Sequence, residues 1–295
     1  MTSTITSPMK LPVQIPTEAF KDQLRVRSYE VGRLGVIGLG TALRYCESLA
    51  TDASAAIGFD RSWYVTHHTA WVVREMTVVL GALPAIGEDL RLATWVSEFR
   101  RVQAQREYAI WRASTGRMVV RASARWAYCD TLRGQLTRIS DEIVEAMKVL
   151  GCRMASRRPL SLAARSQSPA AGTSSTLLLE ARHYETDTQQ HINNCVYADW
   201  LDEAFHQTAV AVQLASPVES LRPRFFHIEY IRELVAGDSL RIETAMQPVA
   251  KKHTHRIAAE YSIVHRGSNS AAVRAYSEHR RQSGRSRPML PTDAA

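Results

Sequence analysis

Hydrophobic and polar residues alternate with a period of two in four long stretches of the chain. These stretches are residues 83–96, 106–128, 234–246 and 255–279. Successive side chains of a strand point to opposite faces, so this pattern predicts strands with one buried face. In 106–128 and 255–279 a Gly or Ser turn separates two alternating runs, which predicts two β-hairpins.

Two other stretches have apolar residues at helical spacing. The first predicts a helix from about Thr41 to Ile57, with Gly58 as its C-terminal stop. The second predicts a helix that Asn193 or Asn194 caps and that runs to about Val212. The periodic apolar residues are Ala42, Leu43, Tyr45, Cys46, Leu49 and Ala53 in the first, and Val196, Tyr197, Trp200, Leu201 and Phe205 in the second.

The order of elements repeats, with a helix followed by several strands in each half. "RSYEVGRLGVIGLGTAL" (27–43) aligns without gaps with "RHYETDTQQHINNCVYA" (182–198). We therefore predict an α+β architecture in which a helix wrapped by an antiparallel sheet occurs twice. The predicted parts are an N-terminal extension (1–20), a first half (21–150), a Ser-, Ala-, Pro- and Arg-rich linker (151–176), a second half (177–282) and a disordered tail (283–295).

The composition is that of a globular protein, with 45% hydrophobic and 22% charged residues among 295. No stretch approaches the roughly 18 continuous apolar residues of a membrane span. Lys10 is the only basic residue among the first twenty, so we expect a cytoplasmic protein, with a plastid as the alternative.

Metal and cofactor motifs do not occur in the sequence. The four cysteines lie far apart, which predicts reduced thiols in place of a disulfide framework or a zinc site. The close pairs His67/His68 and His253/His255 lack a third ligand at convincing spacing. A phosphate loop, a dinucleotide fingerprint and a G-x-S-x-G elbow are absent. We therefore predict no metal and no cofactor.

The net charge of +8 is concentrated in two segments. Residues 151–175 carry four Arg and no acid, and residues 251–295 carry nine Lys or Arg against three acids, so the rest of the chain holds −2. Such local excess suits an acidic partner. Surface aromatics and nucleic-acid motifs do not accompany it, so we expect no nucleic acid.

Polar residues gather just before the second helix, in "YETDTQQHINNCVYADWLDEAF" (184–205). The gapless alignment sets four of them over apolar or glycine residues of the first half: Asp187 over Gly32, Gln189 over Leu34, His191 over Val36 and Asn193 over Gly38. A loop that only caps a helix would be similarly polar in both copies. The asymmetry favours a reaction site kept in one half, while a polar capping loop stays the alternative.

These segments, with "IEYIRELVAGDSL" further on, resemble the acyl-acyl-carrier-protein thioesterases of plants and bacteria, which are tandem hotdog-fold enzymes. The resemblance covers about residues 20–282, and its most specific part is the block H-[IV]-N-N-x-x-Y-x-x-W. Six residues match that block: His191, Ile192, Asn193, Asn194, Tyr197 and Trp200. It implies a double hotdog that hydrolyses fatty acyl-acyl carrier protein.

The resemblance also implies site residues. The Asp and His of the family motif D-x-N-x-H are Asp187 and His191, and the acidic residue on a later strand is Glu233. Gln189 stands where the motif has Asn, and Leu234 stands where many plant relatives have Cys, which excludes a nucleophile there. Glu233, or Asp187 acting with His191, is then the general base.

Alternatives remain for this site. One alternative is that Glu233 is only a solvated or ion-paired residue, and another is that Glu229 takes its place in the reaction. Cys195 is an alternative nucleophile because it lies at a helix start, where the pKa of a thiol tends to fall. The helix N-terminus at Asn193 and Asn194 suits a developing oxyanion, because its backbone N–H groups are unpaired.

The same resemblance implies an acyl-chain tunnel in the first half and an acidic acyl carrier protein as partner. We expect a medium to long fatty acyl chain and leave a homodimer open. Candidates for the tunnel wall are Leu43, Cys46, Leu49, Trp71, Val73 and Met76. Candidates for the carrier-binding patch are Arg153, Arg157, Arg158, Lys251 and Lys252.

Three other functions compete with acyl-carrier-protein hydrolysis. An acyl-CoA thioesterase differs only in the thiol carrier of its substrate, which is coenzyme A in place of acyl carrier protein. A non-catalytic acyl-thioester-binding protein is compatible with Gln189 and Leu234. A double-hotdog hydratase is disfavoured, because its D-x-N-P-x-H pattern needs a proline and one more residue between Asp and His.

Overall fold

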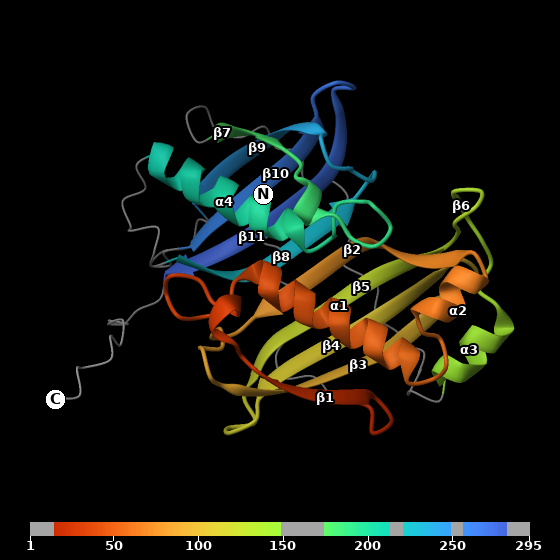
Figure 1. Cartoon of the computed structure of the whole chain (residues 1–295). Helices are drawn as coiled ribbons and strands as arrows, with labels where there is room; N and C mark the ends of the chain where they lie inside the picture. The colour runs from red at the N-terminus through yellow and green to blue at the C-terminus, as the bar shows by residue number, and fades with distance from the viewer. Residues whose placement is uncertain (1–14, 149–173, 213–220, 249–255, 282–295) are drawn as a thin grey trace, which may run out of the picture.

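The computed structural model describes residues 15–148, 174–212, 221–248 and 256–281. Two long helices lie against one highly curved antiparallel sheet (Figure 1). The elements of the first half are β1 (Phe20–Arg25), η1 (Ser28–Glu30), α1 (Leu39–Ala55), α2 (Arg61–Thr66), β2 (Thr69–Leu80), β3 (Asp89–Arg100), β4 (Gln103–Arg112), β5 (Met118–Asp130), β6 (Gln135–Leu136) and α3 (Asp141–Lys148). The elements of the second half are β7 (Ser174–Glu180), η2 (His183–Glu185), α4 (Val196–Ala211), β8 (Leu221–Tyr230), β9 (Ser239–Pro248), β10 (Arg256–His265) and β11 (Ser270–Arg281).

The two predicted sheets are continuous with each other. The strand order is β1-β3-β4-β5-β2-β8-β11-β10-β9-β7, with β6 paired to β5, and the halves join where β2 pairs with β8. Unjoined, these two strands would expose rows of unpaired N–H and C=O groups, and their pairing removes both edges. The seam fixes how the two halves sit against each other.

The helices α1 and α4 lie side by side on the concave face of the sheet (Figure 1). Gly40 permits this approach, because a Cβ there would lie 1.9 Å from Oδ1 of Asp199 on α4. Arg44 of α1 also pairs with Asp199 at 2.5 Å. None of the helices in the described ranges is long and apolar enough to cross a membrane.

The helix and hairpin predictions are confirmed to within a few residues. The helix predicted from Thr41 is observed as α1, two residues earlier at each end, and Gly58 follows it with φ of +92°. The second helix begins at Val196 with Cys195 at the N-cap position, so the predicted cap at Asn193 or Asn194 was wrong, and it ends at Ala211, one residue before the predicted end. The Asn193 side chain instead accepts the N–H of Cys195. Both hairpins are present as β4–β5 and β10–β11.

The short helices α2 and α3 were not predicted, and among the described residues only the first half has them. They enclose a second apolar cluster against the sheet, which includes Phe59, Ile143 and Met147, with Trp63 and Tyr64 packed against it. Apolar spacing over six to eight residues is too short to distinguish a helix from a loop.

The internal repeat is confirmed at the level of single hydrogen bonds. Tyr45 donates to the Glu30 carboxylate at 2.8 Å, and 155 residues later Trp200 donates to Glu185 at 3.0 Å. The gapless alignment of residues 27–43 with 182–198 is therefore the structural one. Most of the predicted N-terminal extension and linker, and all of the predicted tail, lie outside the described residues.

Candidate active site

The polar segment before α4 forms a tight turn. The N–H of Asp187 donates to the carbonyl of His191 at 2.8 Å, and the N–H of Gln190 donates to the carbonyl of Asp187 at 3.1 Å. Gln190 has φ of +64°, a conformation that non-glycine residues adopt rarely. The Asp187 carboxylate accepts the N–H of Gln189 at 2.7 Å, which stiffens the turn.

His191 meets Glu233 beside this turn. Glu233 follows the end of β8 at Tyr230, so the prediction that it lies on a strand was wrong. Nε2 of His191 lies 2.7 Å from Oε2 of Glu233. The N–H of Ile192 donates to the carbonyl of Leu234 at 2.8 Å, so neighbouring backbone holds the two side chains together. The side chains are 39% and 62% exposed, so water reaches the pair.

The first half has the same backbone hydrogen bond but lacks the polar side chains. The N–H of Ile37 donates to the carbonyl of Pro84 at 3.0 Å, as the N–H of Ile192 does to Leu234. Val36 therefore occupies the place of His191, and Leu83, just before Pro84, occupies the place of Glu233. Two apolar side chains replace the polar pair, so the turn does not require polar residues for folding.

A cavity of about 540 Å³ extends from this pair into the first half. Its volume lies within the ~300–1,000 Å³ typical of small-molecule sites. Five of the predicted site residues line it: Asp187, Gln189, His191, Asn194 and Glu233. Trp71 and Val73 also line it, whereas Leu43, Cys46, Leu49 and Met76 are buried in the main core and are not among the lining residues.

The deep end of the cavity carries polar groups that the sequence analysis missed. Arg106 on β4 is only 6% exposed, and its guanidinium contacts the Thr94 hydroxyl at 3.5 Å and Sδ of Met147 at 4.0 Å. Burial lowers the pKa of this Arg106 side chain. Nearby, the Tyr64 hydroxyl bonds to Ser54 at 2.9 Å. An arginine at an inward position of the alternating 106–128 run was the available signal.

The two asparagines at the start of α4 have different surroundings. Asn193 donates from Nδ2 to both carboxylate oxygens of Glu47 on α1, at 3.0 and 3.2 Å, and is not among the cavity-lining residues. Its own oxygens accept the N–H groups of Cys195 and Val196, at 2.8 and 3.0 Å. These two N–H groups, which we expected to be unpaired, are therefore already engaged. Asn194 faces the cavity.

Cys195 directly precedes α4, and it is buried, with 1% of its surface exposed. Its Sγ is 3.0 Å from the Glu47 carboxylate. Burial, and then the charge of Glu47, raise the pKa of the Cys195 thiol well above its ordinary value. A nucleophilic cysteine needs the opposite shift, so this environment argues against a catalytic role.

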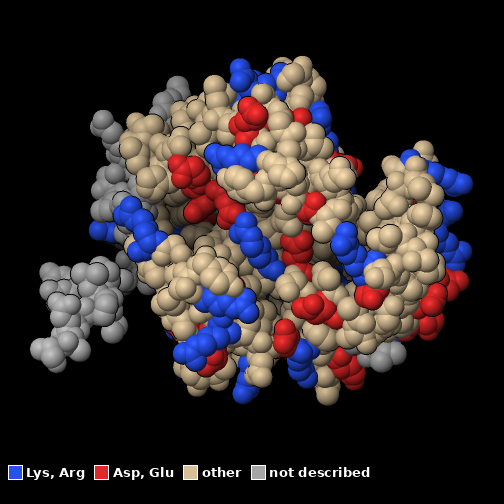
Figure 2. All heavy atoms as spheres, in the orientation of Figure 1, with Lys and Arg blue, Asp and Glu red and all other residues tan. Residues whose placement is uncertain are grey.

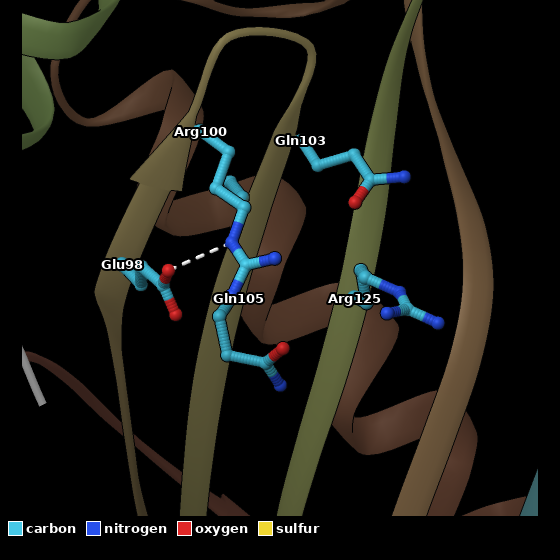
Figure 3. A pocket seen from close by; sticks show the side chains of 6 residues that line it. Glu98, Arg100, Gln103, Gln105 and Arg125 are labelled. Carbon is cyan, nitrogen blue, oxygen red and sulfur yellow. Dashed lines mark hydrogen bonds and ion pairs between the residues drawn. The ribbon is translucent and has the colours of Figure 1, made fainter. Parts of the chain in front are cut away.

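The predicted basic patch of Arg153, Arg157, Arg158, Lys251 and Lys252 lies outside the described residues. A small pocket on β3, β4 and β5 is lined by the polar side chains labelled in Figure 3, among them Glu98, Gln105 and Arg125. Gln105 and Arg125 alternate with cavity-facing residues, so they lie on the opposite face of the sheet.

Comparisons with known proteins agree with this architecture. The chain matches the family model of the acyl-ACP thioesterase N-terminal domain over residues 17–147 and that of the acyl-ACP thioesterase C-terminal domain over residues 169–278. It is 24% identical over 205 residues to oleoyl-acyl carrier protein thioesterase 1, chloroplastic, of Arabidopsis thaliana, a match that covers 65% of this chain and 56% of the relative. The chain thus spans about half the length of the curated relatives it matches.

Two solved structures share the tandem fold. The 12:0-ACP thioesterase from Umbellularia californica superposes with a TM-score of 0.73 at 20% identity, covering 90% of this chain and 95% of the other. An acyl-ACP thioesterase from Bacteroides thetaiotaomicron superposes with a TM-score of 0.67 at 18% identity, covering 89% and 98%. The predicted double hotdog is therefore confirmed.

Proposed function

The chain belongs to the acyl-ACP thioesterase family, and on this premise we propose that it hydrolyses fatty acyl-acyl carrier protein to a free fatty acid and the carrier thiol. The observation that carries the proposal is the contact of 2.7 Å between His191 and Glu233 at a cavity of about 540 Å³ that both halves line. A water-accessible acid–base pair beside a cavity of this size is what thioester hydrolysis needs.

His191 and Glu233 act together to activate water. Because Nε2 faces a carboxylate oxygen, the neutral ring carries its proton there and keeps a lone pair on Nδ1. Nδ1 takes a proton from water as the water oxygen attacks the thioester carbonyl carbon. Glu233 stabilises the imidazolium that forms. The C–S bond then breaks, and His191 returns the proton to the departing sulfur.

The oxyanion needs donors other than the N–H groups of Cys195 and Val196, because Asn193 engages both. The side-chain amides of Asn194 and Gln189 line the cavity beside His191, and each carries N–H donors. We assign the oxyanion to these amides. The extra methylene of Gln189 relative to the family asparagine lengthens its reach.

The acyl chain occupies the part of the cavity in the first half. Its walls there include Trp71, Val73 and Val96, and α2 and α3 close the far end. The second half has no counterpart of these helices among the described residues, which agrees with one acyl site per chain.

Cationic side chains at the mouth suit an acidic carrier protein. Arg74 and Arg232 are exposed, line the cavity and lie on the side of Glu233. On the face of the molecule shown in Figure 2, basic and acidic side chains are intermixed, so this face as a whole does not favour an acidic partner. We propose that the two arginines at the mouth guide the carrier locally.

The test is thiol release from acyl-carrier-protein and acyl-CoA thioesters of matched chain length. We expect wild type to prefer the carrier-linked substrates, and His191→Ala and Glu233→Gln to lose about 10²- to 10⁴-fold in kcat. His183→Ala removes an exposed histidine of the same half and is the matched control. Equal rates of thiol release from acyl-CoA would contradict the proposed preference for acyl-carrier-protein substrates. Binding of the thioester without thiol release would identify a non-catalytic acyl-binding protein.

A further inference from the structure

Three side chains with metal-ligating groups meet at the seam between the halves, on the face of the sheet opposite the cavity. They are Glu75 on β2 and His227 and Glu229 on β8, and their ligand atoms all lie within 4.8 Å of one another. Met76 and Ile228, which alternate with them, pack in the main core on the other face. The cluster is therefore separate from the proposed active site.

His227 is buried with one ring nitrogen unpartnered. The side chain is 1% exposed. Its Nδ1 bonds to the Thr77 hydroxyl at 2.7 Å, whereas Nε2 has no hydrogen-bond partner and lies 3.6 Å from Oε1 of Glu229. Buried polar atoms are nearly always satisfied, so an orphaned Nε2 directed at a carboxylate needs a ligand.

Glu75 and Glu229 bring two carboxylates together, because they are direct partners in the β2–β8 register. Arg125 on β5 offsets one of the two charges, since its Nη2 lies 2.5 Å from Oε2 of Glu75. This arginine is the one labelled beside Gln105 in Figure 3, and it leaves the other oxygen of Glu75 available.

We propose that Glu75, His227 and Glu229 bind one divalent transition-metal cation of the Zn²⁺ class. Imidazole nitrogen and carboxylate oxygen are ligands that Zn²⁺ accepts, at about 2.0–2.2 Å. Two ligands at that distance on a tetrahedral ion lie about 3.4 Å apart, close to the 3.6 Å between Nε2 of His227 and Glu229.

The surroundings of the three ligands suit such a site. Metal-binding histidines almost always bond through their other ring nitrogen to a fixed partner, as His227 does to Thr77. The Glu229 side chain is 32% exposed, so the ion enters and keeps a water ligand from that side. Because β2 belongs to the first half and β8 to the second, the ion joins the two halves. Its role is to stabilise the seam.

The experiment uses the full chain without an affinity tag, stripped with a chelator, mixed with Zn²⁺, dialysed, and then assayed for bound metal and thermal unfolding. We expect one Zn²⁺ per chain and a higher Tm with zinc than without it. His227→Gln abolishes both effects. Thr77→Val keeps the three ligands but loosens the ring, so the zinc affinity falls about 10- to 100-fold.

The matched control is His191→Gln, which removes the histidine of the other His–Glu pair and is expected to bind zinc like wild type. Absence of stoichiometric Zn²⁺, Co²⁺ or Mn²⁺ in wild type would overturn the proposal, and so would binding that survives His227→Gln. Loss of zinc in His191→Gln would assign the metal to the other site and also overturn it. Circular dichroism verifies folding. If His227→Gln does not fold, Glu229→Gln, whose wild-type side chain is partly exposed, serves in its place. Loss of bound zinc in that variant supports the proposal, and retained zinc overturns it.

Discussion

Glu47→Ala tests whether the first half supports the site of the second. Glu47 is on α1, yet its carboxylate accepts two contacts from Asn193, at 3.0 and 3.2 Å, and one from the Cys195 thiol at 3.0 Å. Hydrogen bonds to a charged group contribute about 1.5–3 kcal/mol, and a thiol is a weak donor. Asn193 is half-buried and Glu47 lines the cavity, so water compensates in part. We expect the free energy of unfolding to fall by about 2 kcal/mol.

The same change is expected to lower kcat. Asn193 follows His191 by two residues and holds the N–H groups at the start of α4, so a looser Asn193 displaces the catalytic turn. A displacement of about 1 Å costs on the order of 100-fold in rate. Glu47→Gln is the control, because its amide oxygen still accepts from Asn193.

Urea unfolding followed by circular dichroism gives the stability of each variant, and thiol release gives kcat. The reasoning is refuted if Glu47→Ala unfolds within about 0.5 kcal/mol of wild type, a difference typical of surface substitutions without a specific contact. It is also refuted if Glu47→Gln is as damaging as Glu47→Ala, since loss of charge and not loss of an acceptor would then explain the effect.

Four other predictions address single residues. Cys195→Ser is expected to retain thiol release, because burial keeps the thiol protonated; loss of release with the fold intact would return Cys195 to the mechanism. Burial lowers the pKa of His279 from 6.5 to about 3. The contribution of neutral His279 to the free energy of unfolding is therefore fully present above pH 6.5, and it falls by about 1.4 kcal/mol per pH unit between pH 6.5 and pH 3. Urea unfolding on either side of pH 6.5 should show that the free energy of unfolding depends less steeply on pH in His279→Gln than in wild type. Arg106→Met removes a buried cation and is expected to stabilise the protein by about 1 kcal/mol or more and to shift preference toward longer saturated chains; a lower Tm would show that Arg106 is needed for folding. Arg74→Glu is expected to lower kcat/KM for carrier-linked substrates more than for acyl-CoA at low salt, and an equal effect on both would contradict steering of the carrier.

Sequence reasoning reached the elements whose evidence is local. The helix at Leu39–Ala55, the hairpins and the glycine turns depend on side-chain period and on residues that accept positive φ, and both can be read within a short window. The polar turn was found for a similar reason, since the silent copy at Gly32 and Val36 provided an internal comparison. Glu233 came from the family resemblance, and the structure brings it to 2.7 Å from His191.

The side-chain pattern along the chain thus predicted one helix and one hairpin in each half and the polar segment that we propose as the reaction site, but it missed β1 and β7, which precede the helices. Only the packing of the elements joins the two sheets at β2–β8, brings Glu47 to Asn193 and places Arg106 in the cavity lining. It alone brought Glu75 to His227 and Glu229. Glu75 and His227 are 152 residues apart in the sequence, and Glu47 and Asn193 are 146 apart. Periodicity reports which face of an element is buried, but contacts across such separations depend on how the elements pack.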